Sequence, residues 1–221
     1  MLKHVISCLS LLLLLTMSVS VAHAQSDEKK FEVGGQFSLL GSTTRTASST
    51  VFTEDRTHVP GFGGRFGYNA SKYFALEAEV NFFPRDRDLE GGQKFQGLFG
   101  VKAGKRFEKV GVFGKARPGF IRFDKGDYVF GTGGCITVFP PPLACYRPVA
   151  TTNFAADLGG VFELYPSDRT LVRFDVGDTI IHFNRRNVAA TSTVFAGLVV
   201  IPAPAETKHN LQFSAGFGFR F

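Results

Sequence analysis

The sequence predicts an all-β fold, namely a transmembrane eight-stranded antiparallel up-and-down β-barrel. Three observations lead to this prediction. The chain begins with an export signal and afterwards has no apolar run long enough for a spanning helix. Eight later segments alternate between apolar and polar residues. The connections between those segments are alternately short and long, which is typical of barrels that cross a membrane.

The N-terminal 24 residues have the features of a cleaved signal peptide. A basic start, Lys3-His4, precedes an apolar stretch over residues 5–21, and Ala22-His23-Ala24 is a small-x-small cleavage site. We therefore expect residues 1–24 to be removed and residues 25–221 to form one exported barrel domain. An N-terminal anchor helix is the alternative, but the apolar stretch is on the short side for a bilayer span of about 20 residues.

The eight segments place apolar residues at every second position and charged or polar residues between them. Each is long enough for a tilted transmembrane strand of about 9–11 residues. Pro118 lies inside the fifth segment and predicts a bulge or a strand end there. In chain order, the charged residues of the polar face are Glu32 in Lys30–Leu40, Arg65 in Val59–Asn69, Glu77 and Glu79 in Tyr73–Phe83, Lys102 and Arg106 in Gln93–Phe107, Lys115 and Arg117 in Val110–Phe123, Asp157 and Glu163 in Thr151–Leu164, Arg173 and Asp175 in Arg169–Phe183, and Arg220 in Lys208–Phe221.

The connections divide the predicted barrel into two different ends. Short and long connections alternate strictly, so all short ones and both ends of the domain lie on one side. Short connections fit periplasmic turns, and long polar ones fit extracellular loops. We expect the loops over residues 41–58 and 124–150 to be the best candidates for recognition. The short connections are Asn69–Lys72, Glu108–Lys109 and Tyr165–Asp168, and the long ones are Gly41–His58, Pro84–Gly92, Asp124–Ala150 and Asn184–Thr207.

Alternation alone does not decide which face of a barrel is outside, because soluble lipocalin-like barrels have the same parity. The polar face carries six acids and seven bases, a near balance that suits a self-paired interior filled with side chains. We expect Glu77 and Glu79 to pair with Lys102, Arg106 and Arg65, and this network to block a wide aqueous path. Replacing Glu77 or Arg65 with alanine should then lower the temperature at which the folded form is lost.

The carboxyl end carries a resemblance to a known family. The stretch FSAGFGFRF, Phe213–Phe221, ends on an aromatic residue with aromatic or apolar residues at every second position before it. It looks like the C-terminal insertion signal of bacterial outer-membrane β-barrels, and residues 31–221 resemble the small OmpA-type and OmpX-type barrels in plan. LVRFDVGD, Leu171–Asp178, is similar to the penultimate strand of that broad family. The chain departs from the family in having no Trp for the aromatic girdles.

The resemblance implies a place in the outer membrane of a Gram-negative bacterium. It also implies contact with outer-membrane lipid and lipopolysaccharide, and reading of the C-terminal strand by the barrel-assembly machinery. We expect a monomer without an appended peptidoglycan-binding domain. The residues of the insertion signal are Phe213, Phe217, Phe219 and Phe221.

Two cysteines remain after the signal peptide, and both lie in the third long connection. Cys135 and Cys145 are separated by nine residues, and export places them in an oxidising compartment. The sequence therefore predicts a disulfide between them. Metal binding is the alternative, but no histidine lies near them in the sequence.

No residue pattern indicates catalysis, a cofactor or a metal. His58, His182 and His209 lack metal-ligand spacing. A Ser–His–acid hydrolase could use His182 or His209 with Ser192, but no nucleophile motif accompanies them. Although the isoelectric point is near 9.3, the bases are scattered singly along an exported chain, which argues against a nucleic-acid partner. We therefore expect neither an enzyme nor a cofactor-binding protein.

The expected function is a structural, adhesive or loop-mediated binding role, with a barrel interior closed by paired charges. One alternative is a narrow passive porin-like channel along gaps left by interior glycines, and a second is a lipid A-modifying enzyme. The interior glycines are Gly34, Gly63, Gly67, Gly100, Gly104, Gly159, Gly216 and Gly218. The loop arginines that could contact acidic lipopolysaccharide groups, although solvated surface charge is the simpler interpretation, are Arg45, Arg56, Arg147, Arg185 and Arg186.

Overall fold

The computed structural model describes residues 29–47, 52–84, 91–131, 145–192 and 197–221. Side chains at residues 42–47, 52–56, 91, 189–192 and 197–199 are outside this description. The predicted signal peptide also lies outside the described residues. Within them, no helix is long and apolar enough to cross a membrane.

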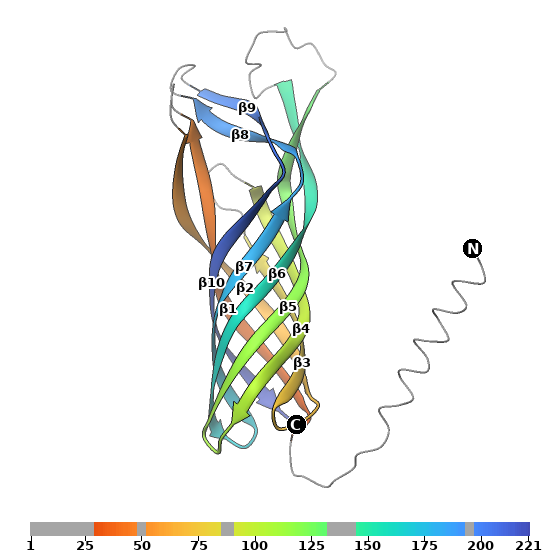
Figure 1. The fold of residues 1–221 in the computed structure, drawn as a ribbon, viewed down its shortest axis with the longest axis vertical. Coiled ribbons are helices and arrows are strands. Elements are labelled where there is room, and N and C mark those ends of the chain that lie inside the picture. The colour runs from red at the N-terminus through yellow and green to blue at the C-terminus, as the bar shows by residue number, and fades with distance from the viewer. Residues whose placement is uncertain (1–28, 48–51, 85–90, 132–144, 193–196) are drawn as a thin grey trace, which may run out of the picture.

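The described chain forms a closed antiparallel barrel (Figure 1). Eight strands make the wall in the order β10-β7-β6-β5-β4-β3-β2-β1, and pairing of β10 with β1 closes it. The predicted all-β, eight-stranded up-and-down barrel is confirmed. The wall strands are β1 (Phe31–Ala47), β2 (Phe52–Asn69), β3 (Phe74–Phe83), β4 (Gly91–Arg106), β5 (Val110–Phe130), β6 (Tyr146–Ser167), β7 (Thr170–Phe183) and β10 (Glu206–Arg220).

The two ends of the barrel differ as the connections predict. Tight turns join β2 to β3, β4 to β5 and β6 to β7 at the end where the C-terminus lies, and the longer connections lie at the other end (Figure 1). At that end the prediction of long loops is wrong in part. The β1–β2 and β5–β6 hairpins continue through much of the predicted loops over residues 41–58 and 124–150, because period-2 pairing persists through polar residues that have no apolar face.

The last long connection contains two further strands, β8 (Arg186–Ser192) and β9 (Gly197–Ala203). They form a hairpin, and β8 also pairs in parallel with the tip of β1 at Thr46–Thr191 and Ala47–Ser192. The sequence predicts a long polar loop there, and this prediction is wrong in part. Its second half, GLVVIPA, is a β-branched apolar run of the kind that favours a strand.

Pro118 produces neither the bulge nor the strand end that the sequence predicts. It pairs with Ala156 in an unbroken β5–β6 register, and the β4–β5 pairing has the same register on both sides of it. The register shifts of β5 lie elsewhere, opposite Gly91–Lys94 on β4 and between Phe123 and Asp127 towards β6. Proline can stay in the strand because its missing N–H removes one ladder hydrogen bond and the neighbouring pairs keep theirs.

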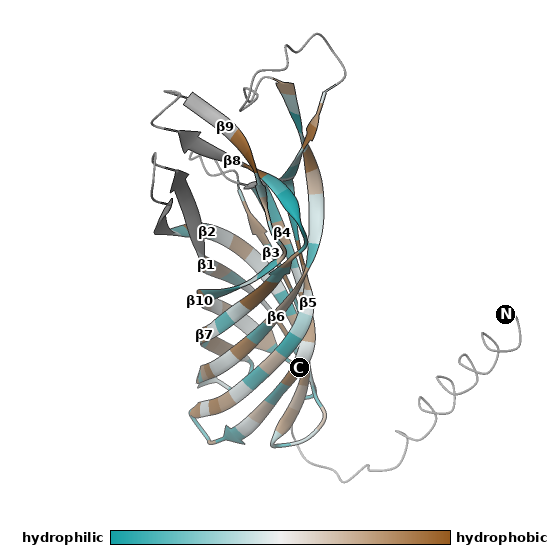
Figure 2. Ribbon diagram, turned by 45° about the horizontal axis from the view of Figure 1, so that its top comes forward, coloured by the Kyte–Doolittle hydropathy of each residue, from teal (hydrophilic) through white to brown (hydrophobic). Residues whose placement is uncertain are grey.

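Apolar and polar residues alternate along the wall strands (Figure 2). The outer face carries large exposed apolar side chains, among them Phe37, Phe99, Phe174 and Phe217. Twelve of the thirteen predicted charged residues of the opposite face are buried, and Arg106 is partly buried. A surface of this kind suits lipid as the surrounding medium, because exposed apolar area would be unfavourable in water.

Candidate functional site

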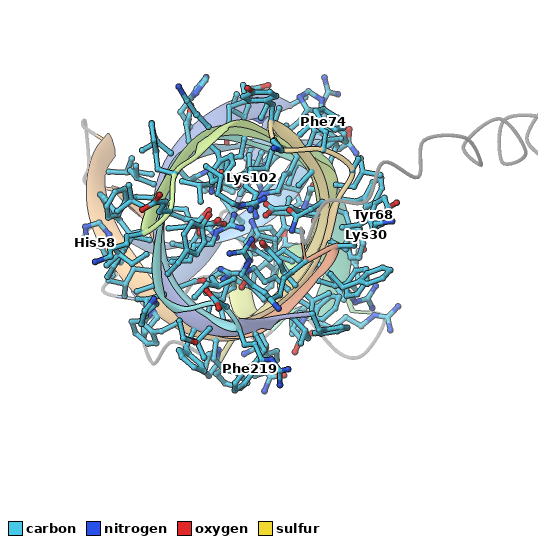
Figure 3. All side chains as sticks on the ribbon, turned by 90° about the horizontal axis from the view of Figure 1, so that it is seen from below. Lys30, His58, Tyr68, Phe74, Lys102 and Phe219 are labelled. Carbon is cyan, nitrogen blue, oxygen red and sulfur yellow. The ribbon has the colours of Figure 1, made fainter. Side chains whose placement is uncertain are left out.

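The inner face of the barrel holds a dense network of ion pairs near the end that carries the tight turns. Lys102 lies near the centre when the barrel is seen along its axis, whereas Phe74 and Phe219 point outward (Figure 3). The Lys102 ammonium lies 2.6 Å from Glu163, 3.3 Å from Glu77 and 3.4 Å from Glu32. These contacts join β1, β3, β4 and β6 across the bore.

Two arginines bridge the rest of the network. The Arg173 guanidinium donates to both oxygens of Glu77 and lies 2.7 Å from Asp175. Arg117 donates to Glu79 and lies 2.5 Å from Asp157. Lys115 pairs with both aspartates, and Arg106 and Arg220 pair with Glu32 at 3.3 Å. Twelve of the thirteen predicted interior charges therefore form ion pairs inside the barrel.

Arg65 is the exception, and the expectation that it pairs with Glu77 or Glu79 is wrong. It is buried, with 5 % of its surface exposed, but within the described residues neither of its terminal nitrogens has a hydrogen-bond partner. Arg117 binds Glu79 instead, although β4 lies between them. Gly100 of β4, which pairs with Glu77, has no side chain to stand in the way of Arg117. Strand adjacency alone did not reveal this route.

A layer of neutral amides and hydroxyls lies above the ion pairs, towards the extracellular side. Asn81 donates to Gln96 at 2.9 Å, and Gln96 in turn donates to Gln212 at 3.2 Å. The Thr179 hydroxyl donates to Gln212 at 2.8 Å. Gln36 donates to Asn81, which also donates to Glu79 and so joins this layer to the charges below it. The layer is buried and spans the bore from β1 to β7.

An apolar layer lies in the bore above the amides. Its members come from six different strands and pack into one cluster. The predicted interior does not include this layer, because that prediction rests on the charged residues of the inner face alone. Apolar doublets were the available signal, since Leu39-Leu40, Phe82-Phe83, Phe120-Ile121 and Ile180-Ile181 place one apolar residue on each face. The cluster consists of Leu40, Val59, Phe83, Ile121, Phe123, Ala155 and Ile181, with Phe183 packed against it.

Most of the interior glycines lie where neighbouring strands approach closely. A Cβ at Gly100 would meet the carbonyl of Ala116 and lie 2.6 Å from the Cα of Arg117, and a Cβ at Gly104 or Gly159 would meet backbone in the same way. These residues therefore permit the tight curvature of a small barrel.

The chain matches the family described as the outer membrane protein beta-barrel domain over residues 9–221. The chain belongs to this family. No curated protein matches it. Among solved structures it is similar to Neisserial surface protein A (12 % identity, TM-score 0.47, covering 86 % of this chain and 97 % of that one). It is also similar to Ail of Yersinia pestis (11 % identity, TM-score 0.43, covering 89 % and 100 %) and to the N-terminal barrel of Pseudomonas aeruginosa OprF (10 % identity, TM-score 0.40, covering 85 % and 97 %).

The β8–β9 hairpin of this outer-membrane barrel joins its two extracellular arms. The backbone N–H of Asn187 donates to Asp127 at 2.8 Å, and its side-chain amide donates to the Tyr128 carbonyl at 2.9 Å. Val200 of β9 packs in a small cluster with Tyr128 and Tyr146. Because β8 also pairs with β1, the β1–β2 and β5–β6 arms are held in one extracellular β-structure.

The remaining predicted residues lie around this extracellular structure. Cys145 is buried and disulfide-bonded; Cys135 lies outside the described residues, so their pairing stays a prediction. Arg147 and Arg185 are exposed, whereas Arg186 pairs with Glu206 at 2.9 Å and stacks on Phe183. The side chains of Arg45 and Arg56 are outside the described part.

The two histidines considered for hydrolysis lie on the outer face, next to each other on β7 and β10. His209 Nδ1 lies 2.5 Å from Asp178, and His182 Nδ1 lies 3.0 Å from the Thr207 hydroxyl. The side chain of Ser192 is outside the described part of the chain. No group of three or more potential metal ligands occurs among the described residues.

The four phenylalanines of the predicted insertion signal lie at the periplasmic half of β10 and point outward. Phe213, Phe217 and Phe219 are between 42 % and 53 % exposed, and Phe221 follows the strand. Their strand pairs with β1 and β7 at the seam where the chain closes on itself. A role in recognition by the assembly machinery stays a prediction.

Proposed function

We propose that this protein is a non-conducting outer-membrane anchor that presents an extracellular β-structure for adhesion or another binding role. The observation that carries the proposal is the filling of the bore by three successive layers of ion pairs, amides and apolar side chains. An eight-stranded barrel has just enough interior for such side chains, so a filled bore leaves no continuous lumen.

The extracellular part supports the binding half of the proposal. Extended hairpins joined by β8 and β9 are a costly arrangement for a protein that only anchors, because ordering each residue costs about 1–2 kcal/mol of backbone entropy. Elements that project from a rigid scaffold are where binding residues commonly lie.

Single-channel recording in planar lipid bilayers tests the closed bore. The protein is first refolded and shown to migrate differently on gels before and after boiling, so that only folded barrels are recorded. We expect electrically silent membranes. Stable, reproducible opening steps from folded protein would contradict the proposal and favour the porin-like alternative.

A further inference from the structure

Basic residues gather at the periplasmic end of the barrel, apart from the bore and the extracellular structure. We call this group the basic rim. Its members come from the start of the described chain, from all three tight turns and from the last turn-side residues of β4, and all are exposed: Lys30, Lys72, Lys105, Lys109 and Arg169. Two acids share these turns, Glu108 and Asp168. Lys29 also lies here, but Asp27 and Glu28 precede it in the sequence, so we leave it out.

The bases of the rim are not used within the protein. Among the described residues none of the five forms an ion pair, whereas the interior bases, Arg65 apart, are all paired. Within the described residues, the only side-chain contact of the rim is that of the Lys105 ammonium, which lies 5.2 Å from the centre of the Phe107 ring. Five unpaired cations against Glu108, Asp168 and the carboxylate of Phe221 give this end an excess positive charge that an external partner could neutralise.

Aromatic residues fix the depth at which the rim lies. Phe31 follows Lys30, Tyr73 follows Lys72, and Phe107 lies between Lys105 and Lys109. Phe31 is 39 %, Phe107 49 % and Tyr73 62 % exposed on the outer surface. Aromatic girdles mark the boundary between the hydrocarbon and the headgroups. The adjacent bases therefore lie at the level of the lipid phosphates of the periplasmic leaflet.

We propose that the basic rim binds anionic phospholipids of the periplasmic leaflet through their phosphates. The distribution of the bases favours this partner: they encircle the barrel end on separate turns (Lys30 is seen at its edge in Figure 3), which suits a plane of headgroups better than one compact ligand. Four of the five are lysines, whose long side chains can extend along apolar surface and place a point charge among phosphates.

Lipid selectivity of the full barrel in mixed bilayers tests the inference. The probe is a bilayer of neutral phosphatidylcholine with a minor share of spin-labelled phosphatidylglycerol or, in parallel, spin-labelled phosphatidylcholine. We expect the barrel to favour the anionic label, by about fivefold for each base in contact with a phosphate, and high salt to weaken the preference.

The rim variant carries Lys30→Gln, Lys72→Gln, Lys105→Gln, Lys109→Gln and Arg169→Gln. Its matched control removes the same charge at the extracellular end through Arg122→Gln, Lys125→Gln, Arg147→Gln, Arg185→Gln and Lys208→Gln. We expect the rim variant to lose the preference and the control to keep most of it. The inference fails if the wild type shows no preference, if the rim variant keeps it, if the control loses as much, or if the rim instead binds soluble peptidoglycan fragments. The bilayer recording that tests the closed bore is a separate measurement. Lipid binding by the rim and closure of the bore can therefore each fail without the other.

Discussion

At the scale of single residues, two buried charges that look alike in the sequence differ in whether they have a partner. Glu77 and Arg65 occupy neighbouring strands, face inward and are both buried. Glu77 is bound by Arg173, lies 3.3 Å from Lys102 and lies 3.6 Å from Arg117, whereas Arg65 has no hydrogen-bond partner on its terminal nitrogens within the described chain. Breaking a buried pair leaves an uncompensated charge, but removing an unpaired charge does not.

We therefore expect Glu77→Gln to destabilise the barrel by about 3–5 kcal/mol. We expect Arg65→Gln to leave stability unchanged or to raise it slightly. Urea unfolding of both variants in lipid vesicles measures the difference, with the temperature at which the detergent-resistant form is lost as a second reading. If both variants lose the same free energy of unfolding, Arg65 stabilises the barrel and is not an unpaired charge.

At the scale of elements, the room for a side chain at a glycine depends on whether the glycine faces the inside or the outside of the barrel. Gly100 faces inward, where a Cβ would lie 2.6 Å from the Cα of Arg117 on β5. Gly160 faces outward, and its nearest atom would be the Phe113 carbonyl oxygen at 3.9 Å, an ordinary contact. The same substitution therefore has opposite consequences on β4 and β6.

Gly100→Ala should destabilise the protein by about 1–3 kcal/mol, because β4 and β5 must move apart to admit the methyl group. Gly160→Ala is the matched control and should be neutral or stabilising by up to about 1 kcal/mol, since it only restricts the unfolded chain. Denaturant midpoints in the same vesicles compare them. If the outward substitution proves as harmful as the inward one, strand crowding is not the cause.

At the scale of the whole molecule, we propose that each of the three layers of the bore closes it by itself. The apolar layer buries side chains of six strands, and the amides and the ion pairs lie below it in the bore. Removing one layer should therefore change stability without opening a path.

A variant with Leu40→Ala, Phe83→Ala and Ile121→Ala tests this independence. Each truncation of a buried large side chain costs about 2–5 kcal/mol in a well-packed core. We expect the variant to unfold at lower denaturant concentration and yet to remain electrically silent when folded. Regular conductance steps in the folded variant would show that the apolar layer alone keeps the wild-type barrel closed.

The sequence by itself determined the barrel, the sorting of its connections and the inward face of its charged residues. A period of two assigns each residue to a face whatever its partners are, and an odd–even pattern over eight segments leaves little freedom in topology. That is why Glu77, Lys102 and Arg173 were placed correctly inside. It is also why the short and the long connections could be assigned to opposite ends of the barrel.

Only the tertiary structure decided which charges pair, where apolar residues close the bore and how the long connections fold. Arg117 binds Glu79 across a strand because Gly100 has no side chain, a relation that depends on register and curvature. β8 pairs with β1, a strand about 145 residues earlier in the chain, as the Thr46–Thr191 partners show. Contacts between distant segments depend on the closed shape of the barrel, and no local pattern in the sequence encodes that shape.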